Sequence, residues 1–181
     1  MPQPLTRFVL LLGLSCLLAA CGFQLRGSSS ATALPEAWKN LYLDTGNPNS
    51  EFSRELQARF SANGIVWAEE RDQAAFILRL GPDRFSQRNL SLNSEARAAE
   101  FELTLQSRFT VLKPEGGAPV IEPSNAVVVK QMENDPRNVV GKAEEIRILK
   151  GEMRGELAQQ ILRRIGFFAA NAAATTEPAG S

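Results

Sequence analysis

Residues 99–112, AEFELTLQSRFTVL, alternate between apolar and polar side chains more regularly than any other stretch of the chain. One set of alternate positions is apolar except for a serine and comprises Phe101, Leu103, Leu105, Ser107, Phe109 and Val111. The other set is polar and comprises Glu102, Thr104, Gln106, Arg108 and Thr110. A period of two residues is typical of a strand with one buried face, so this stretch predicts a half-buried antiparallel strand.

The segments on either side of this strand predict its neighbours. Residues 75–80 form an apolar run that can continue past Gly81 and Pro82, a pair that indicates a bulge or a bend at a sheet edge. Polar residues 93–95 predict a turn between this strand and 99–112, and residues 120–121 and 126–129 predict a further strand interrupted near Pro123. Residues 40–44 predict the first strand, and residues 65–67 a short extended segment.

Two amphipathic patterns predict helices. The first begins at a cap on Asn49 or Ser50 and ends at residues 63–64, with Phe52, Leu56 and Phe60 on one face. The second covers residues 143–168, and its apolar stripe consists of Ile146, Leu149, Met153, Leu157, Ile161 and Ile165. Gly151 and Gly155 lie four residues apart within it, a spacing that would allow close approach to the sheet or to a partner.

The order of these elements predicts the fold class. We expect an α+β fold, a single two-layer α/β sandwich over residues 40–168, in which a mostly antiparallel sheet of about four strands carries two helices on one face. The other face of the sheet is then polar or matched to something else. Residues 169–181 are low in complexity and are expected to form a disordered tail.

The first 22 residues have the layout of an export signal. Arg7 precedes an apolar run over residues 8–18, and small residues stand directly before Cys21. The run is too short to span a membrane, which takes roughly 20 residues. A small-residue cleavage site followed at once by Cys resembles the lipobox of bacterial lipoproteins, whose signal is removed and whose Cys is acylated. We therefore expect residues 1–20 to be a cleaved lipoprotein signal peptide. The alternative is an ordinary secretory signal with an incidental Cys.

Acylation of Cys21 would attach the mature chain to a membrane, because two or more acyl chains hold a protein stably. In bacterial lipoproteins an Asp after the Cys usually marks retention in the inner membrane. Gly22 and Phe23 follow here, so we expect an outer-membrane protein exposed to the periplasm. Residues 21–39, with serines at 28–30 and a proline at 35, predict an extended tether.

Composition excludes several classes of function. The chain has no His, and of its two Cys residues Cys16 leaves with the signal and Cys21 carries lipid. Ser-His and Cys-His nucleophilic catalysis are therefore excluded, and we expect no disulfide, metal or other cofactor. The formal net charge is zero, so nothing favours nucleic-acid binding.

Carboxylate chemistry is the one catalytic route that composition leaves open. Glu51 with Glu55, or Glu144 with Glu145, would serve an outer-membrane enzyme acting on the cell wall. Both pairs lie at predicted helix starts, where the helix dipole favours carboxylates in any case, so we do not expect an enzyme. A passive periplasmic tether without a ligand is a third possibility.

Four strings in order resemble the family of the lipopolysaccharide-assembly lipoprotein LptE: CGFQLRG at 21–27, LYLDTGNPN at 41–49, ELQARFSANGI at 55–65 and LSLNSEARAAEFELTL at 90–105. The resemblance implies a small α/β sandwich that sits inside the β-barrel of the outer-membrane translocon protein LptD. It implies that the chain plugs this barrel, helps it assemble and contacts lipopolysaccharide, and that it is not an enzyme. The implied location is the outer membrane, lipid-anchored, on its periplasmic side and in the barrel lumen.

The predicted topology suggests where lipopolysaccharide would bind. A hairpin tip near Asn93 and the end of the last strand near Asn134 would lie at one end of the domain. Four basic residues, Arg88, Arg97, Arg137 and Lys142, would then cluster there, and they suit the phosphates of lipid A. The alternative is that they are solvated loop charges balanced by Glu95, Glu100, Asp135 and Glu144.

Overall fold

The strand predicted at residues 99–112 is the central strand of the sheet. In the computed structural model, which describes residues 34–92, 98–134 and 139–176, β5 covers Ala98–Leu112. It pairs antiparallel with β6 (Ile121–Glu133) along one edge and with β3 (Phe76–Leu80) and β4 (Arg84–Leu92) along the other. All six alternate positions predicted to face the core are buried, which confirms the predicted face.

The predicted sheet is wrong in strand number and in direction. The sheet has six strands, and β1 (Asn40–Thr45) runs parallel to both of its neighbours, β2 (Val66–Trp67) and β3. The parallel pairs arise because a helix connects β1 to β2, and a helical crossover lets neighbouring strands run in the same direction. Periodicity along single segments carries no information on these pairings.

The bend predicted at Gly81 and Pro82 separates β3 from β4. The backbone N–H of Gly81 donates to the carbonyl of Arg108 at 2.8 Å, and a Cβ on this glycine would lie 3.2 Å from the same oxygen. The hydroxyl of Ser107, the one polar residue on the apolar side of β5, donates to the Gly81 carbonyl at 2.9 Å. The polar exception in the pattern therefore stabilises the bend, after which β4 is largely exposed.

Helix α2 (Glu51–Ala62) begins and ends as predicted. The hydroxyl of Ser50 accepts a hydrogen bond from the backbone N–H of Ser53 at 3.0 Å, and Asn63 is the C-cap. Gly64 follows with a φ of 84°, a conformation that favours glycine. Two short 3-10 helices, η1 (Glu36–Trp38) and η2 (Arg71–Gln73), precede β1 and β3.

Helix α3 (Val139–Thr176) is longer than predicted at both ends. The predicted disordered tail from residue 169 is wrong for residues 169–176, which are helical; residues 177–181 lie outside the described chain. Ala169 is fully buried, and the alanines that follow have the highest helix propensity of any residue. The low complexity of residues 169–176 therefore reflects an alanine-rich helix and not a disordered segment.

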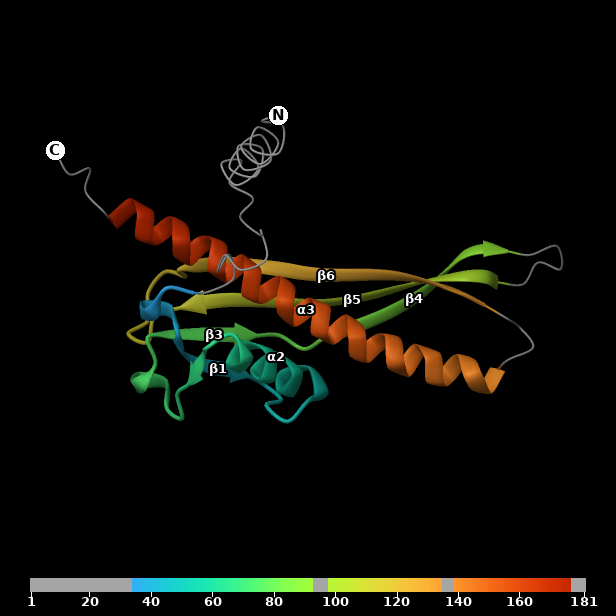
Figure 1. The fold of residues 1–181 in the computed structure, drawn as a ribbon, viewed down its shortest axis with the longest axis horizontal. Helices are drawn as coiled ribbons and strands as arrows, with labels where there is room; N and C mark the ends of the chain where they lie inside the picture. The colour runs from blue at the N-terminus through green and yellow to red at the C-terminus, as the bar shows by residue number, and fades with distance from the viewer. Residues whose placement is uncertain (1–33, 93–97, 135–138, 177–181) are drawn as a thin grey trace, which may run out of the picture. The chain divides into compact units, whose positions relative to one another are not determined.

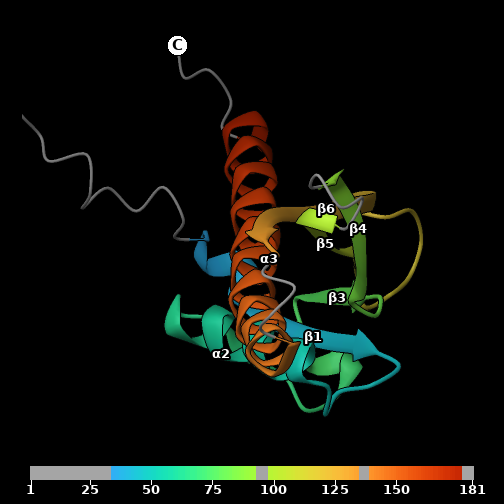
Figure 2. The ribbon, with the colours of Figure 1, turned by 90° about the vertical axis from the view of Figure 1, so that its right-hand side faces the viewer.

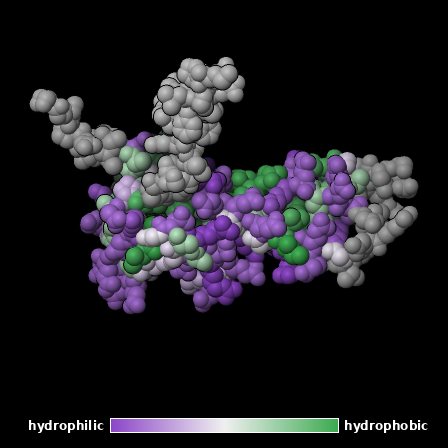
Figure 3. All heavy atoms as spheres, in the orientation of Figure 1, coloured by the Kyte–Doolittle hydropathy of each residue, from purple (hydrophilic) through white to green (hydrophobic). Residues whose placement is uncertain are grey.

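Both helices cover the same face of the sheet, as predicted (Figures 1 and 2). The core between them contains Phe52, Leu56 and Phe60 of α2, Met153, Leu157 and Ile161 of α3, and Leu103 and Leu105 of β5, all at most 1% exposed. In the view of Figure 3, hydrophilic residues cover most of the visible described surface, and hydrophobic residues show only in small separate groups.

The opposite face of the sheet carries charged side chains beside apolar ones. It carries the ion pairs between Arg79 and Asp44 and between Arg88 and Glu102, together with the exposed valines Val127 and Val129 of β6. Ile77 lies on the same face, two residues before Arg79 and paired with Leu112, and it is fully buried, so this face is polar only in part. The expectation was a face that is polar or matched to something else, and both alternatives remain open.

Gly151 and Gly155 of α3 differ in their surroundings. A Cβ on Gly155 would overlap the guanidinium of Arg59 on α2, whereas nothing lies within 4 Å of a Cβ on Gly151. Close approach therefore occurs at Gly155 alone, and it is to the neighbouring helix rather than to the sheet.

Candidate functional site

A pocket lies at the end of the sheet where β4 ends and β5 begins. Leu92 pairs with Ala98, Glu100 pairs with Glu133, and the N–H of Asn134 donates to the Ala99 carbonyl at 2.8 Å. The hairpin and the end of β6 therefore reach one end of the domain, as predicted. Helix α3 begins at this same end, and the described residues that line the pocket are Ser91, Ala99, Glu100, Met132, Glu133, Asn134, Lys142 and Glu145.

Lys142 is the basic residue in the described lining. Its ammonium lies 3.9 Å from the centroid of the Phe101 ring, on the helix-covered side of the sheet. A cation–π contact of this kind restrains the side chain beside the pocket. Three carboxylates, those of Glu100, Glu133 and Glu145, also line it, so the described lining is acidic overall.

Arg88 does not join Lys142. Its guanidinium donates two hydrogen bonds to Glu102, at 2.6 and 3.0 Å, on the opposite face of the sheet. These bonds lower the pKa of Glu102 below its ordinary value. The prediction that Arg88 clusters with Lys142 is therefore wrong. Their partners, Glu102 and Phe101, are adjacent on β5, and adjacent residues of a strand point to opposite faces of the sheet. Arg97 and Arg137 lie outside the described residues, as does Cys21.

A second cation–π contact accompanies that of Lys142. The ammonium of Lys150 lies 4.8 Å from the centroid of the Phe85 ring. Lys142 and Lys150 are eight residues apart, so they lie on similar sides of α3, and both aromatic partners are on strands beneath it. The sequence analysis did not predict either contact. The available signal was a pair of lysines at helical spacing in α3 together with phenylalanines on the apolar face of the strands.

Three of the four carboxylates considered for catalysis are engaged in ion pairs, and the fourth, Glu145, lines the pocket. Glu51 pairs with Arg154, Glu55 with Arg59 at 2.5 Å, and Glu144 with Arg147 at 2.7 Å. The hydrogen bond from Arg147 lowers the pKa of Glu144, which is opposite to what a general acid needs at neutral pH. Within the described ranges, no group of three or more Asp or Glu residues is arranged to hold a metal ion. None of the helices in these ranges has an apolar stretch of the length needed to span a bilayer.

Comparison with known proteins gives the family. The family model described as LptE: Lipopolysaccharide-assembly matches residues 38–165, which run from η1 into the last third of α3. The chain belongs to the LptE family. The match includes every described strand and α2, so the relationship covers the sandwich rather than a single motif.

Relatives of similar length support the assignment to the LptE family. The LPS-assembly lipoprotein LptE of Photorhabdus laumondii is 28% identical over 157 residues, covering 86% of this chain and 83% of the relative. The protein of the same name from Yersinia pestis is 30% identical over 158 residues, covering 86% and 73%. Both names describe lipoproteins, whereas the acylation of Cys21 remains a prediction for this chain.

Solved structures share the fold of this LptE-family chain. The crystal structure of the rare lipoprotein B from Shewanella oneidensis has a TM-score of 0.66 and 26% identity, covering 74% of this chain and 98% of that one. The solution structure of a lipoprotein B from Nitrosomonas europaea has a TM-score of 0.68 and 21% identity, covering 86% and 97%. The second of these supports the fold alone.

Proposed function

We propose that this chain is an outer-membrane lipoprotein subunit of the lipopolysaccharide translocon. In this proposal it plugs an LptD-type β-barrel, helps that barrel assemble, and binds lipopolysaccharide during its delivery to the cell surface. The observation that carries the proposal is the family match over residues 38–165, because it spans the sandwich as a whole. The relatives' shared name, LPS-assembly lipoprotein, supports the same role.

The ion pairs on the face of the sheet away from the helices support a place inside a barrel. The lumen of an outer-membrane barrel is polar, so a plug needs a polar surface toward the wall. On this face the charges of Arg79 and Arg88 are already paired with Asp44 and Glu102. Insertion would therefore not leave these two arginines without a carboxylate partner.

We assign lipopolysaccharide binding to the end of the domain that carries Lys142. The described strands β4 and β5 lead into the segment that contains Arg97, and β6 leads into the segment that contains Arg137. Because Glu100, Glu133 and Glu145 line the pocket, Lys142 alone does not give a positive site. The proposal therefore requires Arg97 and Arg137 to supply charge and bidentate hydrogen bonds to lipid A phosphates.

Purification of the acylated protein from detergent-solubilised outer membrane tests the role in the translocon. We expect a large β-barrel protein to purify with it in near-equal amount. An enzyme acting on the cell wall or a passive tether would purify without the barrel. Purification without a barrel protein would exclude the role as a translocon subunit, whether or not the chain binds lipopolysaccharide.

Titration with lipopolysaccharide tests the binding site separately. Charge reversal at two positions, R97E with K142E, should weaken binding at least tenfold, because each charge-assisted contact contributes roughly 1.5–3 kcal/mol. The matched control is K150E, which loses the same kind of cation–π contact on the same helix. The unfolding temperature should be similar in all three proteins. Unchanged binding by the double variant would exclude this site.

A further inference from the structure

The last third of α3 exposes two adjacent phenylalanines. Phe167 is 66% exposed and Phe168 is 42% exposed, and their ring centroids lie 6.2 Å apart in an edge-on arrangement. Arg163 and Arg164 precede them by four residues each, so each arginine lies next to a phenylalanine on the helix surface. We call these four residues the aromatic–basic patch.

Three of the four residues of the patch, Arg163, Phe167 and Phe168, are exposed on the surface of the helix. Ile165 and Ala169, between and beside its members, are fully buried in the core. Arg164 is fixed against the sheet, because it donates to the Asn125 carbonyl at 2.9 Å and lies 5.9 Å from the Phe109 ring centroid. The two phenylalanines are therefore carried by a helix that is packed against the sheet. No residue in the described part of the chain covers their exposed surfaces.

Charge favours a negatively charged occupant. Residues 157–176 contain two arginines and neither Asp nor Glu. A helix segment that combines exposed aromatic residues with basic neighbours has the composition of a segment that lies in a membrane interface. Anionic phospholipid offers both an apolar interior for the rings and phosphates for the guanidinium groups.

The patch lies at the end of the domain where the chain enters it. Helix α3 runs along the sheet from Lys142, beside Phe101, to Arg164, which bonds to Asn125 near the start of β6. Trp38 of η1 stacks on Phe76, the first residue of β3, at a ring separation of 4.0 Å. Figure 1 shows η1 and the C-terminal part of α3 at the same end of the sheet.

The short segment between Cys21 and the domain limits how far the end that carries the patch can lie from the membrane. Leu34 is the first described residue, is buried in the core, and lies 13 residues after Cys21. A segment of that length spans at most about 45 Å when fully extended. If Cys21 is acylated, as the proposed function requires, the end of the domain that carries the patch is held within that distance of the membrane surface. The pocket at Lys142 is at the other end of β5, a strand roughly 50 Å long.

We propose that the aromatic–basic patch docks on anionic phospholipid, with Phe167 and Phe168 in the headgroup region and Arg163 at the phosphates. Docking adds a second, non-covalent attachment beside the acyl anchor. The pocket at Lys142 then lies at the end of the domain opposite the docked patch. The inference rests on the proposed lipid anchor but not on the barrel or on lipopolysaccharide binding.

Flotation with vesicles tests the patch without the anchor. The mature chain, residues 21–181 with Cys21→Ser, is mixed with vesicles of phosphatidylethanolamine and phosphatidylglycerol at about three to one. We expect it to float with them, and F167S/F168S should lower the partition coefficient at least tenfold. The matched control is I148S, which removes a 49% exposed apolar residue elsewhere on α3 and should change nothing. Vesicles of phosphatidylcholine alone should bind more weakly.

Several results would overturn the inference. These are no flotation of the parent chain, equal flotation of parent and F167S/F168S, or an equal loss with I148S. Sedimentation that shows a dimer abolished by F167S/F168S, without vesicle binding, would assign the patch to a second copy instead. The thermal unfolding of each variant is measured alongside. Purification of acylated F167S/F168S should still bring down the barrel, so failure of the barrel experiment and failure of flotation are separate outcomes.

Discussion

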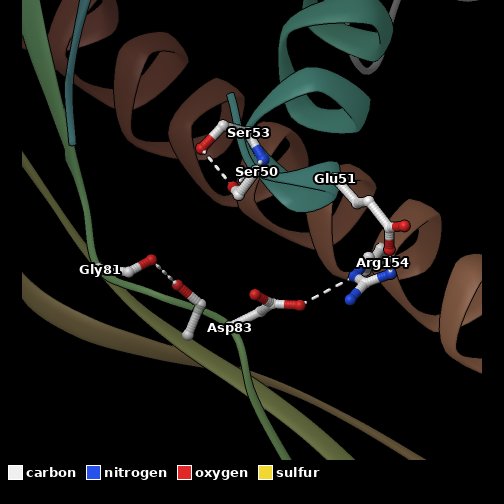
Figure 4. A network of polar contacts seen from close by, with 7 residues as sticks. Ser50, Glu51, Ser53, Gly81, Asp83 and Arg154 are labelled. Carbon is white, nitrogen blue, oxygen red and sulfur yellow. Dashed lines mark hydrogen bonds and ion pairs between the residues drawn. The ribbon is translucent and has the colours of Figure 1, made fainter. Parts of the chain in front are cut away.

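Arg154 on α3 donates from Nε to the carboxylate of Asp83, in the bend between β3 and β4, at 2.8 Å (Figure 4). The two residues are 71 positions apart in sequence, and their side chains are only 16% and 18% exposed. Arg154 also pairs with Glu51 in the first turn of α2. One guanidinium therefore connects the sheet to both helices that cover it.

Loss of this connection should destabilise the domain. We expect Arg154→Met to lower the free energy of unfolding by about 1–3 kcal/mol, because it leaves the carboxylate of Asp83 partly buried without its partner. Glu51→Gln should cost less than about 1 kcal/mol, since the side chain of Glu51 is 67% exposed and well solvated. Urea unfolding of the three proteins measures both values. Equal losses in the two variants would mean that Asp83 is not the important partner.

Acid should weaken the fold through two exposed ion pairs. Arg88 and Arg147 lower the pKa of Glu102 and of Glu144 below the ordinary value of 4.5. A carboxylate whose pKa is lower in the folded state stabilises the fold, and this contribution is complete when the pH is above the pKa of the unfolded state. It is lost as the pH falls through the lowered pKa of the folded state. Unfolding followed from pH about 6 to about 3 should show stability falling with pH, and less steeply in E102Q/E144Q. A double variant with the parent's slope would contradict the assignment.

Patterns local to one segment could be predicted from the sequence. The alternation in 99–112 fixed which residues of β5 are buried, and Ser50 with residues 63–64 marked the ends of α2. Gly81 and Pro82 marked the bend between β3 and β4. Each of these features depends on residues within a few positions of one another, where propensity and capping act directly.

Relationships between distant segments could not be predicted in the same way. Nothing in β1 shows that it pairs parallel to β3, and nothing near Arg154 points to Asp83. Arg88 was expected beside Lys142 because both are near one end of the domain, but strand alternation placed it on the other face. The end of α3 was missed because its alanines carry no amphipathic pattern.

Gly151 and Gly155 of α3 should respond differently to substitution by alanine. Gly151→Ala should raise the free energy of unfolding by about 0.5–1 kcal/mol, because the helix gains propensity and the Cβ meets nothing. Gly155→Ala should gain less or lose stability, because its Cβ must displace Arg59 from its pair with Glu55. In an Arg59→Ala background, Gly155→Ala should stabilise as Gly151→Ala does. Urea unfolding checks this, and a larger gain at 155 than at 151 in the parent would contradict it.

Replacement of Cys21 should separate folding from attachment. Cys21 lies 13 residues before Leu34, the first residue of the described domain, so Cys21→Ala should leave the thermal unfolding of that domain unchanged. Without acyl chains, only weak interfacial contact with lipid remains, and contact that depends on charge is screened by salt. In cells that lack the barrel partner, the Cys21→Ala protein should therefore leave the outer-membrane fraction in a high-salt wash, whereas the parent should stay. Retention of the variant through that wash would mean that something other than acylation at Cys21 anchors the chain.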